Sequence, residues 1–286
     1  MIHTERLLHN YAALGFSTAV DNPVHFLIEP EKPSVTPAPF GVCVRPRIGT
    51  PTFVPTATSD PEEYLEALAG VIKESGSVDN VPTRYAVKLA ARGYKLQVCD
   101  RRTREYVFET RALATLPGSG FASERRYLRR AERLYEFRLL TQDAIPSVLD
   151  FEAEWRGDYL RRHPGESISH ADAVSAALAI ADSVPESYRL RILGGFERES
   201  DKLVSVAVGV MLSADTWHAP FRYALTAGHP YLSAASFTML ARHYADVPFE
   251  NDGCHRVSLP GLTAFKNRFL TPAVAGKQQR FFTIHR

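Results

Sequence analysis

Two spacings of apolar residues alternate along the chain, and together they predict helices packed on sheets. Residues 59–76 (SDPEEYLEALAGVIKESG) repeat apolar positions at helical spacing. Ser59 or Asp60 can cap the start of this helix, Pro61 suits its first turn, and a glycine ends it. Residues 188–197 and 202–214 instead alternate in the way neighbouring antiparallel strands do. Such segments recur along the chain, so we predict an α+β protein.

The two halves of the chain show a similar order of elements, although no exact sequence repeat is present. In the first half we expect a helix over residues 2–15 and a strand over residues 24–29. The second half ends with a short strand, a helix and a closing strand over residues 278–286. Each half therefore predicts helices laid against a largely antiparallel sheet. We predict two domains, residues 1–135 and residues 136–286.

Composition narrows the class of protein only a little. The 286 residues are 45% hydrophobic and 10% aromatic, which is enough for a substantial core. The net charge of +2 does not by itself indicate a nucleic-acid binder, and the three distant cysteines lack zinc-site spacing. No apolar run approaches the roughly 20 residues of a membrane helix, and the N-terminus lacks a signal-peptide core. We expect a cytoplasmic protein with no membrane span, metal or resident cofactor.

One predicted helix carries an unusual density of arginine. In the segment SERRYLRRAERL, helical geometry would place the side chains of five arginines within an arc of roughly 140° around the helix axis. Apolar residues would lie on the opposite side. These arginines are Arg125, Arg126, Arg129, Arg130 and Arg133. Two interpretations stay open: a solvated face, which charge runs usually are, or a surface that binds phosphates along a nucleic-acid backbone.

Catalytic motifs of high specificity are absent, and the remaining candidates are single residues. The sequence contains no GxxxxGK[ST], HExxH or GxSxG pattern. Glu154 and Trp155 fall on a helix that should border the sheet, where Glu154 faces either a cleft or solvent. His229 precedes an apolar helix and serves as either a turn residue or a base.

The segment from residue 249 to residue 273 raises a separate question. It holds a turn with Asn251 and Asp252, then a β-like run, and then a short apolar helix that contains Lys266. A lysine on such a helix either extends its ammonium past the apolar residues to water or reaches into a cleft.

This segment, together with residues 278–286, resembles the last part of the C-terminal domain of bacterial phosphatidylglycerol lysyltransferases and their uncharacterised soluble relatives. The matching residues are Asn251, Gly253, Gly261, Leu262, Lys266, Phe269 and Pro272. Residues 104–137 also resemble the strand, Leu-x-Gly and basic-helix segment of that family, although Gly118-Ser119 stands where the family often has Gly-Lys. Trp155 is again in pattern, and the resemblance runs from about residue 80 to the end.

The resemblance implies two tandem GNAT-like acyltransferase domains, each a mostly antiparallel sheet flanked by helices. It implies transfer of an aminoacyl group from an aminoacyl-tRNA to an amine or hydroxyl. Because no membrane helix is expected, the acceptor should be a small soluble molecule, such as a metabolite or a natural-product intermediate.

The same resemblance suggests roles for the candidate residues. Lys266 would bind a phosphate or stabilise the carbonyl oxygen, and Asn251 and Asp252 would orient the acceptor or simply form a turn. Tyr223 or His229 would relay a proton, Glu154 and Trp155 would bind substrate, and the arginine helix would receive the tRNA acceptor arm. We expect replacement of Lys266 by alanine to leave the fold intact.

Two other functions stay open at this stage. A GNAT domain commonly uses acyl-coenzyme A, whose pyrophosphate binds a glycine-rich turn before a helix, but the nearest segment here, LTAGHPYLSA, has one glycine and a proline. Alternatively, the chain is a non-catalytic RNA-binding or partner-binding protein on a GNAT scaffold, which predicts a basic face without a convergent pocket.

Overall fold

The computed structural model describes residues 34–45, 50–98, 105–165, 168, 172–225, 229, 231–253, 260–270, 274 and 281–286. These residues form helices and two six-stranded sheets, which confirms the predicted α+β class. The contacts divide the chain into two compact units. Unit 1 comprises residues 1–108, 212–216 and 251–286, and unit 2 comprises residues 109–211 and 217–250. The predicted helix over residues 2–15 and strand over residues 24–29 lie outside the described residues.

The first sheet has the strand order β1-β2-β3-β4-β12-β5. Neighbouring strands are antiparallel except for the parallel pair β3 and β4. Its strands are β1 Ser34–Ala38, β2 Gly41–Arg45, β3 Thr52–Pro55, β4 Ser77–Pro82, β5 Lys95–Val98 and β12 Phe281–His285. Helices α3, Pro61–Ser75, and α4, Thr83–Ala91, pack on this sheet around Leu65, Val81 and Leu89, all fully buried.

Helix α3 begins and ends as its sequence predicts. The side chain of Asp60 accepts a hydrogen bond from the backbone N–H of Glu62 at 2.7 Å, and Pro61 occupies the first turn. Gly76 ends the helix in the left-handed conformation with φ of 80°, which glycine adopts without a steric penalty. The predicted helix over residues 59–76 is therefore confirmed.

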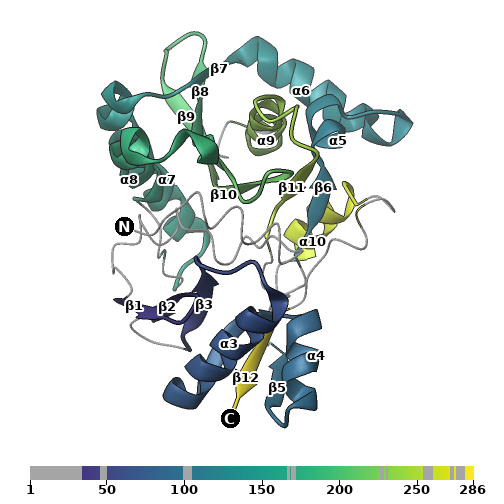
Figure 1. Ribbon diagram of the computed structural model, residues 1–286. Helices are drawn as coiled ribbons and strands as arrows, with labels where there is room; N and C mark the ends of the chain where they lie inside the picture. The colour runs from purple at the N-terminus through teal and green to yellow at the C-terminus, as the bar shows by residue number, and fades with distance from the viewer. Residues whose placement is uncertain are drawn as a thin grey trace. The chain divides into compact units, whose positions relative to one another are not determined.

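The last strand of the chain belongs to the first sheet. Strand β12 lies between β4 and β5, and Figure 1 shows it in yellow among the blue elements of unit 1. Thr283 Oγ1 also donates to Asp79 Oδ1 at 2.8 Å. The two units are thus not the consecutive ranges 1–135 and 136–286 predicted from the sequence. A strand near the C-terminus can form its backbone hydrogen bonds with any open sheet edge. Here it pairs with strands that lie about two hundred positions earlier in the sequence.

The second sheet has the order β6-β11-β10-β9-β8-β7, and β7, β8, β9 and β10 pair antiparallel. The strands are β6 Val107–Glu109, β7 Tyr135–Leu139, β8 Arg191–Glu197, β9 Leu203–Met211, β10 Thr216–Ala224 and β11 Phe249–Asn251. The other helices among the described residues are α5 Thr110–Thr115, α6 Ala122–Leu134, α7 Ile145–Arg162, α8 Ala173–Ile180, α9 Leu232–Arg242 and α10 Pro260–Asn267. Short 3-10 turns lie at Ser119–Phe121, Gln142–Ala144, Ala181–Ser183 and Glu186–Tyr188.

Strand β9 is the centre of unit 2 and is buried at every residue. Helices α7 and α9 both pack on it. Ser205 is hydrogen-bonded to Ser236 of α9 at 2.8 Å, so the odd-numbered residues of β9 face α9 and the even-numbered ones face the other side. A strand covered on both faces needs apolar residues on both, which explains the run LVSVAVGVM.

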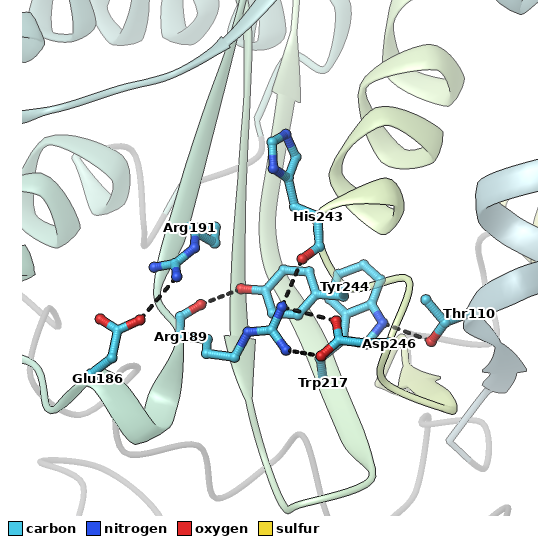
Figure 2. A network of polar contacts seen from close by, with 8 residues as sticks. All are labelled: Thr110, Glu186, Arg189, Arg191, Trp217, His243, Tyr244 and Asp246. Atoms are coloured by element: carbon cyan, nitrogen blue, oxygen red, sulfur yellow. Dashed lines mark hydrogen bonds and ion pairs between the residues drawn. The ribbon is translucent and has the colours of Figure 1, made fainter.

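A polar network surrounds Trp217 and Tyr244 in unit 2 (Figure 2). Trp217 donates from Nε1 to Thr110 Oγ1 at 2.9 Å and stacks on Tyr244 with ring centres 4.5 Å apart. Arg189 makes two hydrogen bonds to Asp246, at 2.6 and 3.0 Å, and its backbone carbonyl accepts from the Tyr244 hydroxyl. A Cβ on Gly209 would lie 2.6 Å from the Tyr244 ring, so this strand position has room only for glycine. We interpret the network as structural.

Candidate active-site residues

Helix α7 buries a carboxylate that its sequence does not single out. Glu152 is 2% exposed, and its Oε1 accepts hydrogen bonds from the backbone N–H groups of Val174, at 2.8 Å, and Ser175, at 3.2 Å. These groups open helix α8, where four N–H groups lack partners within the helix. In the described part of the chain, Oε2 has no hydrogen-bond partner. Burial raises the pKa of Glu152, and hydrogen bonding by the Ser175 side chain and by the backbone N–H groups of Ser175 and Val174 only partly opposes this.

Trp155 and Tyr223, two of the predicted site residues, meet beside this carboxylate. Trp155 lies one helical turn beyond Glu152, and its ring stacks on Tyr223 at 4.1 Å between ring centres. Tyr223 is in β10 opposite Val206, an even-numbered residue of β9, so it faces away from α9. Burial raises the pKa of Tyr223 above its usual value, and the charge of Glu152 adds to the effect. The hydroxyl therefore stays protonated at neutral pH and can donate a hydrogen bond.

Glu154, the carboxylate predicted to bind substrate, lies on the exposed side of α7. Its side chain is 48% exposed and forms an ion pair with Lys202 at 2.7 Å. The solvent-facing alternative therefore describes its placement, and Glu152 is the buried carboxylate of this helix. The sequence contains a signal for this placement, because Glu152 and Trp155 are three positions apart and so share a helix face.

His229 lies between two residues that neighbouring strands bring together. Tyr135 and Glu197 face each other in the register of β7 and β8. The Tyr135 hydroxyl is 3.0 Å from His229 Nδ1, and Glu197 Oε1 is 3.6 Å from the same nitrogen. Burial and the Glu197 charge raise the pKa of Tyr135, whereas Arg130 lowers it. Both contacts are made to Nδ1, so they fix the orientation of the imidazole ring.

Lys266 is part of the buried structure of unit 1. It is 3% exposed, its Nζ donates to the backbone carbonyl of Asp252 at 2.7 Å, and it lies 3.2 Å from Asp252 Oδ2. The ammonium also lies 5.2 Å from the centre of the Tyr106 ring. The expectation that its ammonium lies outside the core is wrong, because the carboxylate and carbonyl of Asp252 provide partners inside it.

Asn251 and Asp252 form the turn that Lys266 holds. Asn251 Oδ1 accepts from the backbone N–H of Gly253 at 3.0 Å, and Gly253 has a positive φ of 63°. The backbone of the same turn pairs with Tyr106, whose carbonyl accepts from the Asp252 N–H at 2.8 Å. The contacts of Asn251 and Asp252 are thus those of a turn, which was one of the two alternatives for these residues.

The arginine helix α6 presents most of its guanidinium groups to solvent. Arg126, Arg129, Arg130 and Arg133 are exposed. Arg125 differs, because its guanidinium donates to the backbone carbonyls of Leu116 and Gly118 in the preceding loop. We call the four exposed residues the arginine face.

Two tyrosines join the arginine face to helix α9, which packs on α6 in unit 2 (Figure 1). Tyr127 stacks on Tyr231 with ring centres 4.1 Å apart. Arg126 lies over the Tyr127 ring at 5.5 Å, and Arg130 lies over the Tyr231 ring at 5.7 Å. The start of α9, close to His229, is thereby fixed to the cationic helix.

Two further features are absent from the described part of the chain. No group of three or more His, Cys, Asp or Glu side chains there could hold a metal ion. No helix among the same residues is both long enough and apolar enough to cross a membrane.

The α+β fold, with its two six-stranded sheets, is similar to that of several solved structures. A conserved protein of unknown function from Bacteroides thetaiotaomicron is similar over 98% of this chain and 97% of its own, with 16% identity and a TM-score of 0.72. The C-terminal domain of a protein assigned as a lysylphosphatidylglycerol synthetase from Agrobacterium fabrum is similar over 99% and 92%, with 13% identity and a TM-score of 0.63. L-PGS from Bacillus licheniformis is similar over 98% and 87%, with 13% identity and a TM-score of 0.60.

These similarities confirm the resemblance predicted from the sequence as far as the fold is concerned. No protein-family model matches the sequence, and neither does any curated protein. At 13–16% identity the shared property is the fold, and the chemistry has to be argued from the residues of this chain.

Proposed function

We propose that the protein is a GNAT-like transferase that moves an aminoacyl group from an aminoacyl-tRNA to an amine or hydroxyl of a small soluble acceptor. The observation that carries the proposal is the fold similarity, over almost the whole chain, to two proteins named for the synthesis of lysylphosphatidylglycerol. The arginine face supports a polyanionic donor in particular. The cytoplasmic location that this donor requires stays a prediction.

The arginine face is suited to the acceptor arm of a tRNA. Guanidinium groups bind phosphates through paired hydrogen bonds and keep their charge at every physiological pH. Four of them on one exposed helix repeat at a spacing that a phosphate backbone can follow. In this proposal α6 holds the arm and the tyrosine pair places the start of α9 beside its end.

The reaction itself needs no covalent enzyme intermediate, because an aminoacyl ester is already activated. The nucleophile attacks the ester carbonyl, its bond to the carbonyl carbon forms, and the bond from that carbon to the ribose oxygen breaks. One proton has to leave the nucleophile and one has to reach the ribose oxygen. His229 is the proposed carrier through Nε2, with Tyr135 and Glu197 orienting its ring. Lys266 is in this proposal a positioning residue for the turn that contains Asn251 and Asp252.

A transfer assay tests the donor. The purified protein is incubated with a pool of radiolabelled aminoacyl-tRNAs and a low-molecular-weight cell extract, and labelled small molecules are separated from free amino acids. We expect a labelled adduct that is lost when the donor is first treated with RNase. His229→Ala should lower its rate about 10²–10⁴-fold, the usual contribution of a general acid–base group. An adduct formed from acetyl-coenzyme A and none from the tRNA pool would favour acyl-CoA dependence instead.

A binding assay tests the arginine face separately. We expect Arg126→Glu/Arg130→Glu to weaken tRNA binding and to reduce the slope of log affinity against log salt by about one for each phosphate that the variant no longer neutralises. The matched control is Lys73→Glu/Lys95→Glu, which changes the net charge equally at exposed lysines of unit 1. Equal binding by the two double variants would contradict this role of α6.

A further inference from the structure

We infer that Glu152, together with Trp155 and Tyr223, forms a subsite for an ammonium group of the substrate. The inference rests on the proposed function only in assigning that ammonium to the amino group of the transferred aminoacyl residue. The subsite lies within unit 2, where helices α7 and α8 and strand β10 supply its residues.

The two carboxylate oxygens of Glu152 have different surroundings. Oε1 accepts two backbone hydrogen bonds from the start of α8, which fixes the orientation of the carboxylate. Oε2 is buried and has no hydrogen-bond partner among the described residues. A buried carboxylate oxygen without a partner loses the solvation that it has in water, and this loss costs far more than an ordinary hydrogen bond contributes. A ligand that donates to Oε2 recovers the loss.

The neighbouring charges favour a cation at this oxygen. Asp172, just before α8, acts on both Glu152 and Tyr223 as a further negative charge. It forms an ion pair with Arg156, so this cation is already engaged by a carboxylate. The Trp155 ring and the Tyr223 ring add electron-rich surfaces, which attract ammonium groups and repel anions. A phosphate would be repelled by the charges of Glu152 and Asp172.

Tyr223 would help to select an ammonium group and would line its path from the surface towards Glu152. Trp155 is 9% exposed, whereas Tyr223 is only partly buried, so the stacked pair reaches from the interior to the surface. The raised pKa of the Tyr223 hydroxyl keeps it neutral. A neutral phenol can accept a hydrogen bond from an ammonium without requiring a second charge.

The amino group of the donor fits this subsite better than the nucleophile of the acceptor does. An amine that attacks a carbonyl has to be neutral, and a buried carboxylate stabilises the charged form instead. The amino group of the aminoacyl residue takes no part in bond formation and can stay charged throughout. Binding it as an ammonium would place the ester carbonyl at a constant distance from Glu152.

Tryptophan fluorescence gives a direct test that needs no tRNA. The chain has two tryptophans, and Trp217 is fully buried, so Trp155 is the reporter and Trp155→Phe the check of this assignment. The probes are the amides of the proteinogenic L-amino acids, their N-acetyl derivatives and propylamine. We expect at least one amide to quench Trp155 saturably, its N-acetyl derivative to have no effect, and Glu152→Gln to weaken binding about 10-fold to 100-fold.

Two variants separate a binding role from a structural one. Glu152→Gln keeps an oxygen for the two N–H groups of α8 and removes the charge, and Glu154→Gln makes the same change on the exposed side of α7. We expect Glu154→Gln to bind amides as the unaltered protein does. The subsite is refuted by equal binding in Glu152→Gln, by quenching with N-acetyl amides, by tighter binding of propylamine, or by the absence of any amide effect.

The outcomes also distinguish the subsite from the proposed function. Amide binding that depends on Glu152, without any product from aminoacyl-tRNA, would support the subsite and contradict the proposed donor. Product from aminoacyl-tRNA, with amide binding unchanged in Glu152→Gln, would support the donor and contradict the subsite.

Discussion

Two buried carboxylates, one in each unit, are stabilised in opposite ways. Asp252 lies beside the ammonium of Lys266, which binds both its carboxylate and its backbone carbonyl. Glu152 lies beside no cation that contacts it in the described structure, and two backbone N–H groups at the start of α8 hold one of its oxygens. In the first arrangement the buried charge has its counter-charge within the protein, 3.2 Å away. The second leaves an oxygen for something else, so burial of charge alone does not distinguish a structural carboxylate from a functional one.

The largest effect on stability should come from removing the counter-charge of Asp252. Lys266→Met removes the ammonium and leaves Asp252 as a buried charge, which typically costs about 3–5 kcal/mol of unfolding free energy. Chemical denaturation measures the loss. The control is Lys202→Met, which removes an exposed ion pair with Glu154 and should cost less than about 1 kcal/mol.

A double variant sharpens this first prediction. Lys266→Met/Asp252→Asn removes both charges, so it should recover part of the stability lost in Lys266→Met alone. Equal stability of Lys266→Met and Lys202→Met would mean that the pair of Lys266 and Asp252 does not stabilise the fold.

An intermediate effect should come from removing the side chain of Glu152. Glu152→Ala leaves the N–H groups of Val174 and Ser175 without their acceptor and should cost about 1–3 kcal/mol. Thermal unfolding of this variant beside Glu154→Ala, which removes an exposed carboxylate of the same helix, isolates the buried contribution. If the two alanine variants unfold together, the contact with α8 contributes nothing to stability.

The smallest effect is a pH dependence that belongs to Glu152. Its pKa is raised on folding from the ordinary value of 4.5, so the folded state binds the proton more tightly than the unfolded state does. The carboxyl therefore contributes most stability below pH 4.5 and loses this contribution as the pH rises through its folded-state pKa.

Glu152→Gln cannot titrate and isolates this contribution. The unfolding free energy of the unaltered protein should fall relative to that of the variant as the pH rises above 4.5. Denaturation at a series of pH values gives the difference, in which the other titrating groups cancel. A difference that stays constant, or grows in the opposite direction, would show that folding does not raise this pKa.

Features that depend on residues close together in the sequence could be predicted from it. The cap, proline and terminal glycine of α3 act within a few residues, and their effect was predicted correctly. Trp155 was expected to contribute to a site, and it contacts another candidate, Tyr223. The α+β class followed from apolar spacing alone.

The remainder depends on contacts between distant segments. Lys266 is buried because Asp252, fourteen positions earlier, provides its partners. The spacing of apolar residues around Lys266 gives no information about this contact. Helical spacing places Glu152 on the face of Trp155, but the start of α8, which holds its carboxylate, lies more than twenty positions away in the sequence. Strand β12 has an ordinary strand pattern, and this pattern does not say which sheet it joins.

Strand β12 also sets the order in which the protein can be completed during synthesis. It separates β4 from β5, so among the described strands β5 has no sheet neighbour until residues 281–285 have left the ribosome. Unit 2 can pair β7, β8, β9 and β10 well before that point. The half of the protein that is made first is therefore the half that is finished last, and until then its incomplete sheet offers open edges to chaperones and to other chains.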